Sequence, residues 1–389
     1  MKVAILAPHM FMHKDIVHKT IFSPGELVID LVKEMKKKGL DITFISPNYN
    51  IQAVENINGD LGYVEEELKL RGYGIMELLH KHPLLFSTIA RQIQSELIAK
   101  TFELANSGAF DLVHVYMNEE ELAMVFARFC KIPVVFTHHE PFNYLTRYRT
   151  IFPKYKKLNW ISISFSQRKS LGNNTNWVGN IYHGIDQNKY ELNLTPKEDY
   201  YAYFGRIIEP KGVHLAIAAA KQAGFKLKIA GKHYGENTKD SYWREKIEPY
   251  IDGDQIQFIG FINDKKLKQD FLGNAKALLM PSIWDEPFGL VMLEAMACGT
   301  PVIGFDSGAI PEIVDHGKNG FIVNKCFKAF EIRNVLDEEM SVRDFAGKIA
   351  HASSLNRDTV RKSFEKNFTL DKMASEHINL YSKLITKLI

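Results

Sequence analysis

Short apolar strands alternate with helices from the first residues of the chain. Residues 2–7 and 41–45 are predicted to be strands, and residues 25–38 between them carry apolar side chains at helical spacing. A helix that joins two parallel strands makes a right-handed crossover, so this order predicts a βαβ unit in a parallel sheet. Open sheets of this kind bind ligands beyond the carboxyl ends of their strands, which makes the loop after residue 7 a candidate binding segment.

A helical insertion follows this unit, and the strands then continue. Residues 65–82 and 84–105 predict two helices separated by Pro83. Because short apolar runs of this kind are typical of strands buried on both faces, the next strands are predicted at residues 111–116, 132–137 and 160–164.

The alternation starts again in the second half of the chain. New strands at residues 200–204 and 226–230 flank a helix at residues 211–223. A chain of 389 residues is also too long for one ordinary core. The sequence therefore predicts two doubly wound α/β domains, at residues 1–186 and 200–365, with 187–199 as a polar linker and 366–389 as a helix that packs back across the domains.

Composition excludes several classes of protein. Hydrophobic residues make up 46% and charged residues 24% of the chain, which is typical of globular proteins. The net charge of +3 is too small to indicate nucleic acid as the main partner. The three cysteines are widely spaced and predict neither a disulfide framework nor a zinc site. Without a secretory signal or an apolar run of about 18 residues, we expect a cytoplasmic protein.

Residues 281–304 predict a loop, a helix, a turn and a strand. Pro287 suits a first-turn helix position, and Gly299 suits the position just past a helix end. The helix between them is apolar on every side except at Glu294, which indicates a buried helix. An unpaired buried carboxylate is costly, so Glu294 needs donors. Either a structural arginine or the hydroxyls of a bound ligand could supply them.

The second half of the chain resembles glycosyltransferase family 4, whose members have the GT-B fold. Residues 286–290 with Glu294 are similar to the paired-glutamate signature of that family, and residues 205–206 and 210–212 resemble its diphosphate-binding turn. The first half matches more loosely, through residues 111–114, residues 137–139 and Ser164. The resemblance implies two Rossmann-like domains that face each other across a cleft.

It also implies an activity, which is retaining transfer of a hexosyl-type sugar from a nucleotide-diphosphate sugar to a hydroxyl acceptor. No metal and no other cofactor is expected. Arg206 and Lys211 would bind the diphosphate, where preplaced cations stabilise the charge that grows on the leaving group. Glu286 would bind the transferred sugar, Glu294 the ribose, and His139 the sugar from the other domain. The remaining donor-binding residues would be Gly25, Gly205, Gly231, Phe261, Ile262, Phe288, Gly289 and Leu290.

Three details of the sequence bear on this resemblance. Family members often carry paired glycines after the first strand, where this chain has residues 23–26, Ser-Pro-Gly-Glu, so one backbone donor is lost at Pro24. His138 and His139 are adjacent and point opposite ways from a strand end, which argues against a shared metal. The Asp-Gly-Asp triplet at residues 252–254 is interpreted as a solvated turn rather than a metal site.

Alternatives remain for the function and for one charged surface. A sugar-nucleotide epimerase or a non-catalytic sugar-nucleotide-binding protein could use the same fold. Lys33 and residues 36–38 cluster at the end of the first predicted helix. Such lysines complement a helix dipole, and they would also bind an anionic membrane surface if the acceptor is lipid-linked. The sequence does not identify the sugar, the base or the acceptor.

Overall fold

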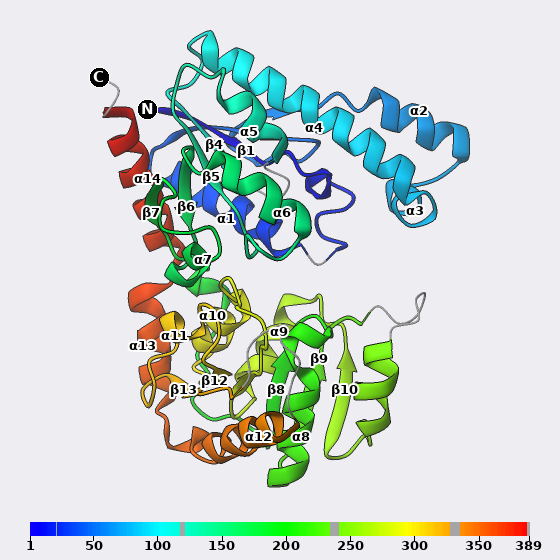
Figure 1. Ribbon diagram of the computed structural model, residues 1–389, viewed down its shortest axis with the longest axis vertical. Helices are drawn as coiled ribbons and strands as arrows, with labels where there is room; N and C mark the ends of the chain where they lie inside the picture. Colours follow the sequence, from blue (N-terminus) through cyan, green and yellow to red (C-terminus); the bar gives the residue numbers. More distant parts are fainter. Residues whose placement is uncertain (21, 117–120, 234–240, 327–334, 387–389) are drawn as a thin grey trace. The chain divides into compact units, whose positions relative to one another are not determined.

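The structure, a computed structural model, describes residues 1–20, 22–116, 121–233, 241–326 and 335–386. It divides into two units (Figure 1). The first comprises Met1–Tyr182 and Leu370–Ile389, and the second comprises His183–Thr369. Each unit contains its own parallel sheet, as the repeated strand–helix alternation predicts.

Within the described residues of the first unit, seven parallel strands form the sheet in the order β3-β2-β1-β4-β5-β6-β7. Strand β1 lies in the interior of the sheet and pairs with β2 on one side and the central strand β4 on the other. Helix α1 (Ser23–Lys37) makes the first crossover, so the predicted βαβ unit is confirmed. The strands are β1 Lys2–Leu6, β2 Asp41–Ser46, β3 Glu55–Asn58, β4 Leu112–Tyr116, β5 Val134–Thr137, β6 Asn159–Ser162 and β7 Trp177–Asn180.

The helical insertion of the first unit contains one more break than the sequence predicts. Residues 65–82 are not one helix, because α2 (Gly62–Arg71) ends at Gly72 in a left-handed conformation with φ 64°. The chain then forms α3 (Ile75–Lys81) and the long helix α4 (Pro83–Asn106), which begins at the predicted proline. Shorter helices complete the unit, at α5 Glu121–Ala127, α6 Thr146–Ile151 and α7 Phe165–Lys169.

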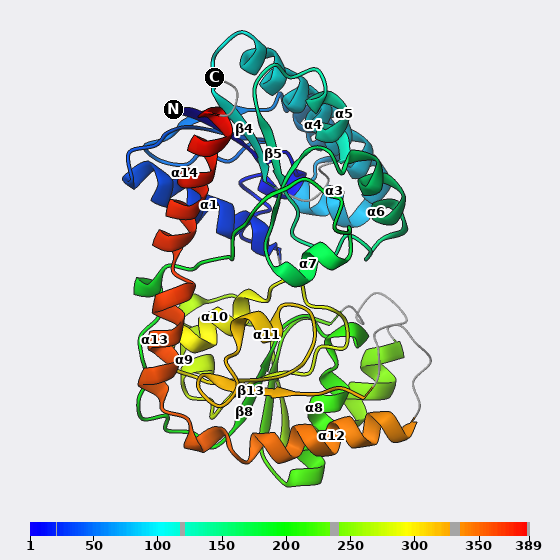
Figure 2. The same cartoon turned by 60° about the vertical axis from the view of Figure 1, so that its left-hand side comes forward.

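The described residues of the second unit form a parallel sheet of six strands in the order β10-β9-β8-β11-β12-β13. Helices cover both faces, with α8 (Val213–Ala223) packed against α12 (Val335–Ile349), and α10 (Leu290–Ala297) against α9 (Lys265–Gly273) and α13 (Arg357–Asn367) (Figure 2). The strands are β8 Tyr201–Phe204, β9 Leu227–Ala230, β10 Ile256–Gly260, β11 Leu278–Met280, β12 Val302–Phe305 and β13 Gly320–Val323, and a short helix α11 spans Ile310–Ile313.

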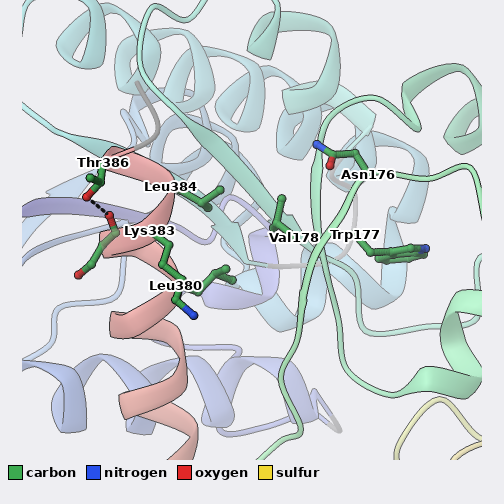
Figure 3. Close-up of a pocket in the computed structure, with 8 residues that line it drawn as sticks. Asn176, Trp177, Val178, Leu380, Lys383, Leu384 and Thr386 are labelled. Atoms are coloured by element: carbon green, nitrogen blue, oxygen red, sulfur yellow. Dashed lines mark hydrogen bonds between the residues drawn. The ribbon is translucent and has the colours of Figure 1, made fainter. Parts of the chain in front are cut away.

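The C-terminal helix α14 (Leu370–Thr386) belongs to the first unit, where it packs against α1. At its end, Leu380 and Leu384 lie opposite Val178 of β7 around a shallow pocket (Figure 3). Two of the lysines at the end of α1 have acidic partners, since Lys37 pairs with Glu34 and Lys38 with Asp371 of α14. Among the described residues, no helix combines the length and the apolar character that crossing a membrane requires.

Residues 187–199, the predicted linker, lie in the second unit rather than between the units. Hydrogen bonds hold this segment there. The Asn193 N–H donates to the carbonyl of Cys298 at 3.1 Å, and the Arg361 side chain donates to the carbonyl of Tyr190 at 2.8 Å. A polar composition therefore did not distinguish a free linker from an extended segment fixed by backbone hydrogen bonds.

Candidate functional site

Two loops of the second unit meet beyond the carboxyl ends of β8 and β11. One is the turn of residues 205–212, and the other is the acidic loop of residues 281–289. Gly212 has φ 69°, and a Cβ there would lie 1.9 Å from the carbonyl oxygen of Pro281, so only glycine allows this approach. The N–H of Ile283 also donates to the carbonyl of Pro210 at 2.9 Å. The two predicted motifs, far apart in the sequence, thus form one site.

Glu286 is the centre of this site, and its side chain is almost enclosed, with the residue 5% exposed. Its Oε2 accepts hydrogen bonds from Lys211 Nζ, from Trp284 Nε1 at 3.0 Å and from Ser282 Oγ at 3.3 Å. Its backbone is fixed as well, because the Ala309 N–H donates to the Glu286 carbonyl at 2.8 Å. Among the described residues, Oε1 has no hydrogen-bond partner, so one carboxylate oxygen is left over.

The charge of Glu286 is set by opposing effects. Burial acts to raise the pKa of its carboxyl, but the charge and hydrogen bond of Lys211, the Trp284 N–H and the charge of Arg206 outweigh burial. The net result is a pKa below the usual value. Glu286 is therefore an ionised hydrogen-bond acceptor at neutral pH, which is the form that binds hydroxyl groups.

Trp284 lies beneath both predicted cations. Its ring centroid is 5.1 Å from Lys211 Nζ and 5.9 Å from Arg206 Cζ, within the range of a cation–π interaction. The Arg206 backbone carbonyl accepts a hydrogen bond from Tyr203 Oη at 2.8 Å, but its side chain makes no hydrogen bond or ion pair with another described residue, so the guanidinium remains available to an anion. Sequence analysis did not assign Trp284 to the site, although its position two residues before Glu286 was a usable signal.

Glu294 lies on the second turn of α10 and has protein donors. Its Oε1 accepts from Tyr190 Oη at 2.8 Å and from Lys268 Nζ at 2.7 Å. The protein donors are therefore a lysine and a tyrosine, whereas the sequence suggested an arginine or the hydroxyls of a ligand. No described residue bonds to Oε2, so this carboxylate also keeps one oxygen for another partner.

The start of α10 differs from the sequence prediction. The helix begins at Leu290, and Gly289 precedes it with φ 96°, so Pro287 lies outside the first turn. Phe288 is 2% exposed, and its ring packs against His183 and Phe368 at centroid distances of 4.8 and 6.3 Å. Its side chain is therefore a core contact. The backbone at Gly289 and Leu290 is what this segment can offer a ligand.

The other predicted donor-binding residues of the second unit lie at the same edge of its sheet. A Cβ on Gly231 would approach the carbonyl oxygen of Gly205 to 1.8 Å, so β8 and β9 end in close backbone contact. Phe261 and Ile262 follow β10, and Phe261 is 45% exposed. Gly205 and Gly231 therefore border the turn that carries Arg206, whereas Phe261 and Ile262 follow the edge strand β10.

Two predicted residues belong to the first unit. His139 follows β5, is 9% exposed and contacts the Tyr116 ring edge-on at 4.6 Å. Its neighbour His138 is enclosed by Phe142, Tyr148 and Phe152, and burial lowers its pKa to about 4. The two histidines thus have different surroundings, as the strand geometry predicts. The Gly25 N–H donates to the carbonyl of Phe22 at 3.0 Å, so this donor is already engaged within the first turn of α1.

The Asp-Gly-Asp triplet forms a turn. Asp252 Oδ1 accepts hydrogen bonds from the backbone N–H groups of Asp254 and Ile256, at 3.0 and 2.9 Å. Over the described ranges, no three His, Cys, Asp or Glu side chains are grouped closely enough to hold a metal ion.

Comparison with known proteins finds similarity to glycosyltransferases. Residues 184–351 match the family model described as "Glycosyl transferases group 1". An uncharacterized glycosyltransferase of Methanocaldococcus jannaschii is 23% identical over 395 residues, covering 90% of this chain and 92% of the relative. Two further relatives are matched over only about half of their own length, 54% and 53%. These matches support glycosyltransferase group 1 activity.

Solved structures support the fold over the whole chain. Sucrose-phosphate synthase of Thermosynechococcus elongatus aligns with a TM-score of 0.68 at 17% identity and covers 100% of both chains. The Anabaena protein HepE, solved with UDP and glucose, aligns with a TM-score of 0.64 at 17% identity, over 98% of this chain and 100% of that one. The chain therefore has the GT-B fold, and the predicted fold class is confirmed.

Proposed function

We propose that this chain is a retaining glycosyltransferase of family 4. It would transfer a hexosyl-type sugar from a nucleotide-diphosphate sugar to a hydroxyl acceptor, without a metal ion. The observation that carries the proposal is the joining of Arg206, Lys211 and Glu286 around one tryptophan at the carboxyl edge of a parallel sheet. Two cations and an ionised acceptor within one small site suit a ligand that has both a diphosphate and hydroxyl groups.

Each residue then has a distinct task. Arg206 offers a planar fork of donors to the diphosphate, and Lys211 offers a point charge. As the bond from the anomeric carbon to the diphosphate breaks, negative charge grows on the diphosphate beside these cations. The cations therefore stabilise the transition state more than the ground state. Glu286 Oε1 would accept a hydrogen bond from the transferred sugar, and Glu294 Oε2 from the ribose. By the family resemblance, His139 would also bind the transferred sugar.

The proton balance needs no side chain as a separate base. In front-face displacement, the acceptor oxygen bonds to the anomeric carbon on the side that the diphosphate leaves. The departing phosphate oxygen takes the proton of the acceptor hydroxyl. Retention of configuration follows from that shared face.

The bound state requires a change of partners at Lys211. Without donor, Lys211 neutralises Glu286, and both side chains are mostly buried, at 15% and 7% side-chain exposure. A diphosphate would attract Lys211, and the sugar hydroxyls would then replace Lys211 as hydrogen-bond donors to Glu286. After the exchange Lys211 would be paired with the diphosphate, and Glu286 would be hydrogen-bonded by the sugar hydroxyls, Trp284 and Ser282, so neither buried charge would lack a partner.

A panel of nucleotide sugars tests the proposal. A true donor should raise the melting temperature by mass action and should be consumed in the presence of a hydroxyl acceptor, with the anomeric configuration retained in the product. Glu286→Ala and Arg206→Ala should each lower turnover by about 10²-fold or more, whereas Arg343→Ala on the exposed face of α12 should not. An epimerised nucleotide sugar from donor alone would replace the proposal with an epimerase. Tight nucleotide binding without turnover on any acceptor would replace it with a binding protein.

A further inference from the structure

The Trp284 side chain contacts three of the predicted catalytic residues, which packing in the core alone would not require. Its indole N–H donates to Glu286 Oε2, and its ring lies under Lys211 and Arg206. It is 3% exposed, so its ring is fixed by the surrounding fold. A single side chain therefore contacts three of the four residues to which catalysis is assigned.

The backbone of Trp284 is held from two sides. Its N–H points to the carbonyl of Pro210 at 3.3 Å, which joins the acidic loop to the turn that carries Lys211. Its own carbonyl accepts from Ser307 Oγ at 2.6 Å. Lys325 Nζ in turn donates to Ser307 Oγ at 2.9 Å and to the Ile283 carbonyl at 2.7 Å. These hydrogen bonds fix the backbone of the loop that carries the indole.

We propose that Trp284 is a positioning residue of the donor site, which orients the Glu286 carboxylate and holds Lys211 and Arg206 close to one another for the incoming diphosphate. The inference rests on the function proposed above. The indole N–H holds one oxygen of Glu286 and so orients the other toward the sugar. The ring face holds the two cations close together without neutralising them, which a carboxylate in the same place would do.

Two substitutions separate the two contacts. Trp284→Phe keeps an aromatic face and removes the N–H donor. It should lower kcat about 10- to 100-fold with the KM for the donor within about threefold, because the orientation of Glu286 is lost while the cations keep their support. Trp284→Leu also removes the aromatic face, so the KM for the donor should rise about 10-fold in addition.

A matched control shows whether the loss of a buried indole alone has such effects. Trp160 is fully buried in the first unit, and its Nε1 donates to the Tyr155 carbonyl at 3.0 Å, the same length as the Trp284 bond. Trp160→Phe should lower the melting temperature and leave kcat and the KM for the donor unchanged.

The pH profile distinguishes positioning from structural support. Loss of the N–H bond should raise the pKa of Glu286, so the acid limb of kcat/KM should move to higher pH in Trp284→Phe and stay in place in Trp160→Phe. Wild-type kcat with an unchanged acid limb in Trp284→Phe would overturn the inference. If the wild-type protein turns over no nucleotide sugar, the proposed function fails instead. The carboxyl pKa of Glu286, followed by ¹³C NMR in wild type and Trp284→Phe, then decides on the contact, and an equal pKa in both would overturn it.

Discussion

The ion pair of Lys211 and Glu286 allows a quantitative prediction for Lys211→Met. This change leaves the Glu286 carboxylate buried with only Trp284 and Ser282 as donors. Removal of one partner from a buried pair typically costs about 3–5 kcal/mol. Because two donors remain, we expect the free energy of unfolding to fall by an amount near the lower end of this range, about 3 kcal/mol at pH 7. For a unit of this size, that corresponds to a fall in melting temperature of roughly 6–12 °C.

The loss should depend on pH with a definite sign. In the wild type the pKa of Glu286 lies below its unfolded value, so the stability it contributes is present above the unfolded pKa and disappears as the pH falls through the folded pKa. In Lys211→Met, burial is less opposed and the folded pKa should rise. The difference in unfolding free energy between the two proteins should therefore be large at pH 7 and should shrink as the pH falls through the folded pKa of Glu286 in each protein.

Calorimetric scans of the second-unit transition at several pH values measure this difference. Lys211→Met combined with Glu286→Gln should recover most of the loss, because no buried charge is then left without its partner. Lys265→Met, an exposed lysine at the start of α9, serves as the control and should stay within about 0.5 kcal/mol of wild type. A loss that is equal at pH 4 and pH 7, or that persists in the double variant, would refute the reasoning.

Three further predictions follow from other parts of the structure. Burial lowers the pKa of His377 to about 4, below its unfolded value of about 6.5. Its neutral form therefore costs no stability above about pH 6.5, but the unfolding free energy of the first unit should fall as the pH drops from about 6.5 toward about 4. His377→Asn should reduce this fall in unfolding free energy by about 3 kcal/mol, measured by urea unfolding. Arg357 donates to the carbonyls of Asn193, Gly273, Ala275 and Cys298, so Arg357→Ala should cost the second unit about 3–4 kcal/mol and Arg357→Lys less, in the same measurement. Glu286→Gln releases Lys211 and should bind a nucleoside diphosphate at least as tightly as wild type while turnover falls about 10²-fold; calorimetric titration showing a parallel loss of affinity would contradict the exchange of partners at Lys211.

Strand–helix alternation predicted both sheets because a parallel strand buried on both faces has a plain apolar signature. Breaks within helical segments were harder to predict. The apolar spacing continues through Gly72, yet this residue ends α2 in a left-handed conformation. Gly289 acts similarly at the start of α10, where Pro287 alone suggested an earlier first turn. In both places, one glycine at positive φ outweighs the pattern around it.

The site residues that sequence reasoning missed are those whose partners lie far away in the sequence. Glu294 was correctly recognised as needing donors, but these are Tyr190 and Lys268, and Tyr190 lies in a segment interpreted as a linker. The contacts of Trp284 with Lys211 and Arg206 depend on the close approach of two loops at Gly212. Local pattern contains no information about such contacts, because they arise only when separate strands end at the same edge of the sheet.

The two glutamates share one electrostatic arrangement, which reconciles stability with binding. Each gives one oxygen to a lysine and a neutral donor, Lys211 and Trp284 for Glu286, Lys268 and Tyr190 for Glu294. Burial of the Glu286 carboxylate without donors would favour its protonation, and a fully bonded carboxylate would have no oxygen left for a hydroxyl. The donors of Glu286 hold the pKa of its carboxyl below the usual value, and in both glutamates one oxygen stays uncommitted. The same lysines that stabilise the ligand-free unit therefore make each glutamate a ready acceptor for the hydroxyl groups of a ligand.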